Sequence, residues 1–519
     1  MSSANAETDD EFADVRAEDG NALAGLFVDY GRAQSTQFVV GAVASVLRML
    51  MELVPSLVLA LAIDSLFFDT RAFSFPLVPQ SWLPTAATDQ FLLVGTLVAV
   101  AYGLNSVLGW LNSYMWNSFA QHFQHEVRVD TYDAMQRRET TFFDDRQTGE
   151  VMSVLNNDVN QLEEFLTTHL NNLVVIVFRV GGMGLVMLFV NWRLALVPLA
   201  AVPALGYVSH KFVSIIHPKY QDVRSSVGRV NSRLENNVAG IETVKAFATE
   251  RFETDRVRDV SEGYLDAQWD AITTRILYFP TLQAITAAAY VSVFFLGGWW
   301  VVTESPPHPF FAGTTVTAGN LVLFLNYSRR FVYPMRQMGQ IINGYQYAQA
   351  ASERILGLLD MEPRVKDEPD ARELRDVEGR VEYDGVSFAY GDADGDSDEQ
   401  VVRDVSFTAD PGDYVGLVGA TGAGKSTLMK LLLRFYDPDE GAVRVDGDDV
   451  RELSLRSLRE SVGYVSQEPY LFYGTVTENV AYGLPDPDPG DVEAACRRAG
   501  AHEFVAELKE GYDTMVGER

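Results

Sequence analysis

The sequence contains very little cysteine and little lysine, and each shortage limits what the protein can be. Its one cysteine, Cys496, cannot form an intrachain disulfide, so no disulfide framework holds the fold and the redox compartment is undetermined. Seven lysines accompany 34 arginines, and 71 acidic residues outweigh 41 basic ones to give a net charge of −30. That charge excludes a protein that binds nucleic acid through bulk positive charge.

The negative charge lies mainly at the two ends of the chain. Residues 1–35 carry −6, residues 361–519 carry −19 and residues 36–360 carry −5. Since 47% of the 519 residues are hydrophobic, the sequence predicts an apolar body between acidic ends, with about three domains in all. A single soluble globule and a disordered chain are both excluded.

The combination of many carboxylates and few lysines resembles the surfaces of proteins from extreme halophiles. In molar salt the Debye length is only about 3 Å, which screens the self-repulsion of such a chain. The sequence therefore favours a halophilic protein. An acidic protein at ordinary ionic strength is the alternative.

Long apolar runs recur between residues 38 and 345. Each is longer than the ~20 residues that cross ~30 Å of hydrocarbon, so membrane spans are favoured over buried core helices. The six predicted spans are 38–67, 89–116, 164–190, 193–216, 276–302 and 317–345. The acidic N-terminus lacks the basic start of a secretory signal, and no cleaved peptide is expected.

Basic residues between the spans predict the orientation. The segments 117–162 and 211–275 contain 4 and 10 bases, whereas the segments on the opposite side contain only Arg71 and Arg193. Lysine and arginine are enriched on the cytoplasmic side of membrane proteins, so both long segments and both termini are expected in the cytoplasm. Their helical periodicity predicts helices that project from the membrane toward a cytoplasmic partner.

A few charged residues lie inside the predicted spans, where charge is costly. Arg48 and Glu52 are four residues apart, which predicts an ion pair on one helix face. Arg179, Arg329 and Arg330 could line a cavity for an anionic or amphipathic cargo. Pairing with other helices, or extension of the side chain to the membrane surface, explains them equally well.

The strongest chemical motif is a phosphate-binding loop. Gly419, Gly424, Lys425 and Ser426 fit the pattern G-x-x-x-x-G-K-[ST], between a strand-like run and a helical run. Backbone N–H groups of such a loop cradle phosphate oxygens at a helix N-terminus. Lys425 would reach the β- and γ-phosphates and Ser426 would bind Mg²⁺. The candidate nucleotide-binding residues of the loop are Gly419, Thr421, Gly422, Ala423, Gly424, Lys425, Ser426 and Thr427.

Two further residues gain meaning from their spacing around this loop. Tyr390 lies 29 residues before Gly419, and its ring could stack on a base. Gln467 follows a second strand-like run, where its amide could bind Mg²⁺ and orient water. Taken alone, Tyr390 is more often a packing residue and Gln467 more often a surface residue.

Together these residues resemble the ATP-binding cassette (ABC) transporters, specifically exporters whose six spans and nucleotide-binding domain share one chain. The resemblance covers roughly residues 25–519. Tyr390 matches the family's adenine-stacking tyrosine, residues 419–427 its Walker A loop and Gln467 its Q-loop glutamine. In the membrane part, two segments resemble the family's first intracellular loop and the sequence after its second coupling helix, namely 142–158 and 238–250.

The resemblance implies a fold and a function. The expected fold is an all-α six-helix transmembrane domain with long cytoplasmic helix extensions, followed by a partial α/β P-loop NTPase domain. The expected domains are an acidic tail (1–35), the transmembrane domain (36–350), a linker (351–380) and part of the nucleotide-binding domain (381–519).

As an exporter subunit, the chain would use ATP and Mg²⁺ to move a hydrophobic or amphipathic compound or a lipid. Lys425 and Gln467 would be catalytic, and Ser426 and Gln467 would bind the metal. The implied partner is a second half-transporter subunit, as a homodimer or a heterodimer. The implied location is the cell membrane, and the resemblance implies no nucleic-acid partner.

The last residues affect this expectation. Residues 511–519 resemble the stretch just before the family's LSGGQ signature, and the printed sequence contains neither that signature nor the Walker B and switch-histidine residues that follow it. We therefore expect this chain alone to be inactive in hydrolysis and to leave an apolar sheet edge open beside the Walker A strand. The alternatives are an ATP-binding regulatory membrane protein that does not hydrolyse ATP, and an ATP-gated channel.

Overall fold

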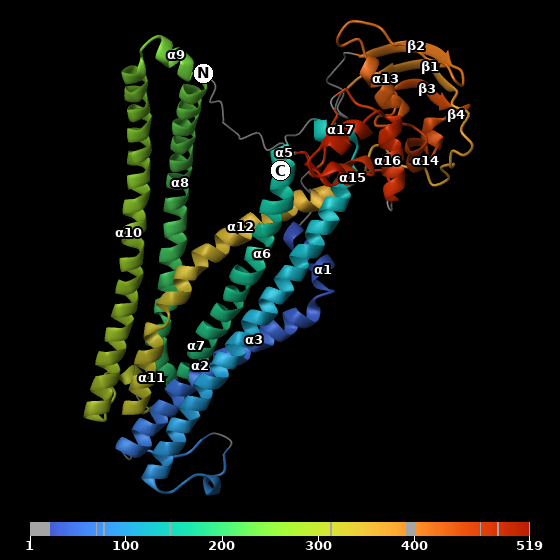
Figure 1. Cartoon of the computed structure of the whole chain (residues 1–519). Coiled ribbons are helices and arrows are strands. Elements are labelled where there is room, and N and C mark those ends of the chain that lie inside the picture. The colour runs from blue at the N-terminus through green and yellow to red at the C-terminus, as the bar shows by residue number, and fades with distance from the viewer. Residues whose placement is uncertain are drawn as a thin grey trace. The chain divides into compact units, whose positions relative to one another are not determined.

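The computed structural model of the chain describes residues 21–68, 70–75, 78–144, 148–311, 314–390, 400–467, 469–484 and 487–517. The chain divides into two compact units, the first comprising Met1–Arg138 and Phe142–Glu362 and the second Glu139–Thr141 and Pro363–Arg519. The first unit is helical and the second contains the strands. In Figure 1 the labelled strands are orange, toward the C-terminal end of the colour bar. A mostly helical membrane part followed by a smaller α/β domain confirms the predicted fold class.

Helices make up the first unit. They are α1 (Ala22–Gly31), α2 (Ser35–Ala62), α3 (Ala87–Gln136), α4 (Thr140–Asp144), α5 (Thr148–Ser153), α6 (Val159–Glu164), α7 (Asn171–Leu199), α8 (Ala201–Ala239), α9 (Ile241–Ala246), α10 (Glu250–Thr303), α11 (Ala318–Arg329) and α12 (Val332–Asp360). Short π-helical turns lie at Ile63–Phe67, Val154–Asp158 and Phe165–Leu170, and 3₁₀ turns at Gln80–Trp82 and Pro309–Phe311. The first part of α4 belongs to the second unit.

The apolar runs of the sequence fall on these helices. Four continuous helical segments among the described residues are long and apolar enough to cross a membrane, namely Ser35–Phe67, Ala87–Gln136, Thr148–Ala239 and Glu250–Thr303. The third of them contains two predicted spans, 164–190 and 193–216. The sixth predicted span, 317–345, is divided between α11 and α12 by a break at Arg330 and Phe331.

A turn at Asn191 separates the two predicted spans within the third segment. Its backbone is extended (φ −157°, ψ 97°), so helical hydrogen bonding stops there. The buried side chain compensates: Oδ1 accepts the Leu194 N–H at 3.0 Å and Nδ2 donates to the Thr315 carbonyl at 3.2 Å. A polar side chain therefore caps the new helix at a place where hydrocarbon could offer no partner.

The start of α11 is fastened to the end of α2. Asp64 is buried and accepts hydrogen bonds from the Thr317 hydroxyl and from the Gly319 N–H, the latter at 2.7 Å. A Cβ at Gly319 would lie 2.0 Å from the Ala60 carbonyl oxygen. Only glycine permits this approach of the two helices, and the carboxylate satisfies N–H groups that open the new helix.

Long helices extend from the membrane part. Helices α8 and α10 lie side by side and are joined at one end by the short α9 (Figure 1). Phe212 of α8 stacks on Tyr278 of α10 with ring centroids 3.9 Å apart, and Lys219 pairs with Asp270 at 2.8 Å. Apolar contact and an ion pair thus hold the two extensions together.

A buried ion pair joins α12 to the segment that precedes α6. Arg354 Nε donates to Asp158 Oδ2 at 2.7 Å, and the Asp158 side chain is 3% exposed. Residues next to the pair in the sequence belong to one buried apolar cluster, among them Leu155, Val159, Leu162 and Ile355. Because a carboxylate in such surroundings needs its partner, this pair specifies how the elements meet.

Replacing Asp158 by Ala should lower the stability of the membrane unit by about 3–5 kcal/mol, because the change leaves the Arg354 guanidinium without its buried partner. Thermal unfolding in detergent measures the effect. Asp255→Ala, at an exposed ion pair with Arg258, is the matched control and should change stability by less than about 1 kcal/mol. Equal effects of the two changes would contradict the structural role given to Asp158.

The second unit contains a four-stranded antiparallel sheet in the order β2-β1-β3-β4. Its strands are β1 (Val381–Phe388), β2 (Val402–Ala409), β3 (Glu440–Val445) and β4 (Asp448–Asp449), and a separate pair is formed by β5 (Gly474–Thr475) and β6 (Met515–Val516). Val381 of β1 faces Ala409 on one side and Val445 on the other. The helices are α13 (Lys425–Leu432), α14 (Leu455–Glu460), α15 (Val476–Val480), α16 (Pro489–Arg498) and α17 (His502–Glu507), with 3₁₀ turns at Val450–Glu452 and Gly511–Asp513.

The two strand-like runs before the predicted nucleotide motifs differ from expectation. Residues 414–419 and 462–466 belong to none of the strands in the described part of the chain. Tyr414 and Val418 are almost fully exposed, as is Val465. An extended segment becomes a strand only when its N–H and C=O groups pair with a neighbour, and no described segment pairs with these two.

The predicted linker, 351–380, consists of two different parts. Its first residues continue α12 to Asp360. Later residues lie on the second unit: the Ser454 N–H donates to the Arg372 carbonyl at 2.8 Å, and the Leu455 N–H to Asp367 Oδ1 at 2.8 Å. Much of this charged interval is therefore held by hydrogen bonds.

Candidate nucleotide-binding site

The glycine-rich loop leads directly into α13. Gly422 and Gly424 have φ values of +83° and +78°, a conformation that side-chain-bearing residues rarely adopt. At Gly424 a Cβ would also lie 2.9 Å from the Val401 carbonyl oxygen. Since the first N–H groups of a helix have no acceptor within it, this loop presents donors where α13 begins.

Lys425 closes the loop on itself. Its ammonium donates to the carbonyls of Gly419 and Ala420 at 3.0 and 2.7 Å. Residues 419–423 and Ser426 are exposed, whereas Thr427 is buried. Within the described part of the chain Lys425 pairs with no carboxylate. A lysine without a carboxylate partner, at the start of a helix, suits a polyphosphate.

Tyr390 lies beside this loop. Its hydroxyl is 3.0 Å from the hydroxyl of Thr427, on the first turn of α13. The half-buried ring contacts Phe388 and Tyr436 edge-on, at centroid distances of 4.9 and 5.2 Å. These three aromatic residues also line a pocket. The structure thus brings together Tyr390 and the loop that the sequence predicted as partners.

Two neighbours of Tyr390 were missed by the sequence analysis. The Lys430 ammonium lies 5.7 Å from the Tyr390 ring centroid and 5.5 Å from that of Tyr436. Lys430 follows Thr427 by three residues, so both occupy the same side of α13. That spacing was visible in the sequence, but the approach of Tyr436 depends on the fold.

Gln467 makes no hydrogen bond with Tyr390 or with the loop among the described residues. It is exposed, in an irregular segment, and makes no hydrogen bond recorded among the described residues. The structure therefore brings Tyr390 and residues 419–427 together but records no contact between Gln467 and the loop.

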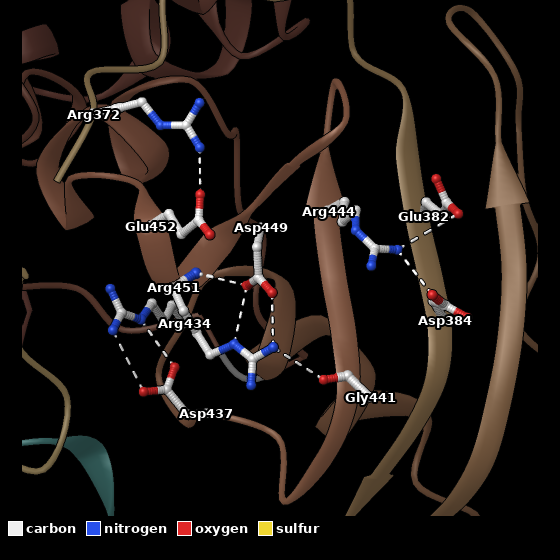
Figure 2. A network of polar contacts seen from close by, with 10 residues as sticks. All are labelled: Arg372, Glu382, Asp384, Arg434, Asp437, Gly441, Arg444, Asp449, Arg451 and Glu452. Atoms are coloured by element: carbon white, nitrogen blue, oxygen red, sulfur yellow. Dashed lines mark hydrogen bonds and ion pairs between the residues drawn. The ribbon is translucent and has the colours of Figure 1, made fainter.

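A network of ion pairs supports the sheet (Figure 2). Arg444 of β3 reaches across to Asp384 of β1 at 3.0 Å. Arg451 binds Asp449 at 2.7 Å and donates to the Gly441 carbonyl at 3.1 Å. These contacts fasten β4 and the turn after it to the rest of the sheet, so their role is structural. Burial alone would raise the pKa of Asp449, but hydrogen bonds and positive charge from Arg451 hold it below its ordinary value.

This pKa shift predicts a pH-dependent contribution to stability. With its folded-state pKa lowered, the Asp449 carboxylate stabilises the fold above its ordinary pKa of 3.8 and loses that effect as pH falls through the folded-state value. Asp449→Asn should therefore be less stable than the original chain at pH 7, and the difference should shrink below pH 3.8. Thermal unfolding at several pH values measures both. A difference independent of pH would contradict the assignment.

The charged residues of the membrane spans pair differently from prediction. Glu52 does not bind Arg48, four residues earlier on α2. Its two carboxylate oxygens bind Arg179 of α7 and Arg330 at the α11–α12 break, at 2.9 and 3.0 Å. The predicted Arg48–Glu52 pair is therefore wrong, because tertiary partners outcompete a weak pair within one helix. Arg329 lies over the Tyr290 ring at 6.0 Å.

Comparison with known families identifies both parts of the chain. The ABC transporter transmembrane region matches residues 38–335, and the ABC transporter family matches residues 402–517. The chain belongs to the ABC transporters, of the exporter type in which the transmembrane region and the nucleotide-binding domain share one polypeptide. This confirms the resemblance inferred from the motifs and supports a membrane location.

Individual relatives are similar over most of the chain. An uncharacterized ABC transporter ATP-binding protein of Bacillus subtilis, YknU, is 32% identical over 80% of this chain and 69% of its own length. A fatty acid ABC transporter ATP-binding/permease protein of Mycobacterium tuberculosis is 32% identical, over 87% and 68%. An ATP-dependent lipid A-core flippase of Syntrophus aciditrophicus is 27% identical, over 88% and 71%.

Proposed function

We propose that the chain is a subunit of an ATP-driven membrane exporter in which ATP binding at residues 419–427 drives switching of the helical domain. The observation that carries the proposal is the loop itself, where Gly422 and Gly424 turn the backbone into α13 and Lys425 rests on neutral carbonyls. A triphosphate offers that ammonium and the helix N-terminus stronger, charged acceptors. Tyr390, tied to Thr427, is proposed to stack on the adenine.

In this proposal the metal site uses Ser426 and Gln467. The hydroxyl of Ser426, exposed at the start of α13, and the amide of Gln467 would hold Mg²⁺. The bound ion would neutralise charge on the phosphate oxygens. Gln467 would also orient the attacking water, and Lys425 would bind the transferred phosphoryl group.

The cargo is proposed to be a hydrophobic or amphipathic compound or a lipid. The names of two relatives, one a fatty acid transporter and one a lipid A-core flippase, support this class. The proposed assembly is a dimer, with a homodimer favoured over a heterodimer, and both termini in the cytoplasm. The proposed domains are 36–350 for transport, 351–380 as linker and 381–519 for nucleotide binding. The acidic surface, with a net charge of −30, supports a halophilic setting.

Lys425→Ala should reduce ATP hydrolysis by a transporter that contains this chain roughly 10²–10³-fold, because it removes a charged donor to the transferred phosphoryl group. Phosphate release by the protein in lipid vesicles measures this. Lys509→Ala, an exposed lysine of the same unit, is the matched control and should retain activity. Hydrolysis that survives Lys425→Ala would sink the role assigned to the loop.

The same assay separates the alternative function. A regulatory membrane protein would bind ATP without hydrolysing it even in the assembly that contains this chain, with or without Lys425→Ala. We also propose that residues 1–519 alone bind ATP without turnover, since their sequence includes no LSGGQ signature. Hydrolysis by this chain without any other polypeptide would contradict that statement.

Tyr390→Ala should weaken ATP binding roughly tenfold, the effect expected from losing one stacked aromatic ring. Tyr390→Phe keeps the ring and loses only the hydroxyl contact with Thr427, so ATP binding should stay near that of the original chain. Titration with a fluorescent ATP analogue, in the absence of hydrolysis, measures both. If Phe and Ala weaken binding equally, the hydroxyl rather than the ring is responsible.

A further inference from the structure

A group of three charged side chains lies among the membrane spans. Glu52 of α2 lies between two guanidinium groups, Arg179 of α7 and Arg330 at the α11–α12 break. Each carboxylate oxygen binds one of them: Oε2 is 2.9 Å from Arg179 and Oε1 is 3.0 Å from Arg330. We call these residues the Glu52 triad.

The triad carries an excess of positive charge. Two guanidinium groups and one carboxylate leave a net charge of +1 in a region where uncompensated charge is costly. The Nε of Arg179 is buried and has no hydrogen-bond partner among the described residues. Glu52 accepts instead from the Nη2 of Arg179, at 2.9 Å. Among the described residues, the triad therefore has one unpartnered donor and one positive charge without an anionic partner.

The surrounding helices hold the triad in place and leave it accessible. Tyr327 is buried one turn before Arg330, and its hydroxyl donates to the carbonyl of Leu53, the residue after Glu52, at 3.1 Å. This contact fixes α11 against α2 beside the triad. The side chains of Glu52 and Arg330 nevertheless remain 26% and 39% exposed. Fixed donors that a solute can reach are what a binding site requires.

We propose that Arg179 and Arg330 bind the oxyanionic headgroup of an amphipathic cargo and that Glu52 holds the two guanidinium groups until the cargo displaces it. A carboxylate or a phosphate presents two oxygens to a planar guanidinium, which makes bidentate binding possible. The hydrocarbon tail would stay among the apolar side chains of the spans. This inference rests on the proposed export function and adds the charge of the cargo to it.

A purely structural triad makes the opposite prediction for Glu52. If the carboxylate is a permanent brace between three helices, its removal loosens the site and weakens any ligand. If it is a displaceable stand-in, its removal eliminates a competitor and strengthens an anionic ligand. Glu52→Gln distinguishes the two, since a variant that fails to fold cannot gain affinity.

The test is binding to the full chain in detergent micelles without nucleotide. The probes are a fluorescent polyene fatty acid, its methyl ester and a fluorescent lysophosphatidic acid, so the arms distinguish a carboxylate from a phosphate headgroup. We expect an acid to bind more tightly than the ester. Arg179→Ala and Arg330→Ala should each lower the affinity for that acid roughly tenfold, as for one lost charge-assisted hydrogen bond, and Glu52→Gln should raise it. The ester should respond to none of these changes.

Arg329→Ala is the matched control, because Arg329 adjoins Arg330 but lies over the Tyr290 ring. It should leave the preference for the acid unchanged. Three results would each overturn the proposal. They are equal affinities for acid and ester, a loss of acid affinity in Arg329→Ala as large as in Arg330→Ala, and a loss of acid affinity in Glu52→Gln. Since no ATP is present, such a result leaves the nucleotide role of Lys425 untouched, and a failure of that role leaves this binding result standing.

Discussion

The membrane part of this protein depends on one constraint: hydrocarbon offers no hydrogen-bond partner to a peptide group. Helices satisfy nearly all of their backbone internally, and at two places where a new helix begins a polar side chain replaces the missing partner. Asn191 does so at the turn between two spans, and Asp64 does so where α11 begins. Few polar residues occur in these spans, and those at helix ends determine where the chain reverses.

The same constraint explains which features the sequence could predict. The predicted apolar runs fall on helices, and four helical segments among the described residues are long and apolar enough to cross a membrane. They did not predict the break at Arg330 and Phe331, which depends on how α11 packs against α2. They also misassigned the partner of Glu52, since spacing along one helix contains no information about a guanidinium 127 residues away.

In the nucleotide-binding part, prediction was strongest where function requires particular residue types. The glycines and Lys425 were identified from their spacing, and Tyr390 does meet Thr427. The sequence analysis did not find Tyr436 or Lys430, whose contact with Tyr390 arises from packing. It also expected strands in 414–419 and 462–466, but strand formation requires a neighbour as well as propensity. The role of Gln467 remains a proposal that rests on its position in the sequence.

The self-closed loop around Lys425 has a consequence for selectivity among anions. Any ligand must first displace the two carbonyls that the ammonium already contacts. An anion that reaches the ammonium alone exchanges one set of hydrogen bonds for another. Its net gain in binding free energy over the resting loop is therefore small. A triphosphate reaches the ammonium and the N-terminus of α13 together, and therefore recovers the cost of opening. We therefore expect the resting loop to favour a polyphosphate over an anion that reaches the ammonium alone.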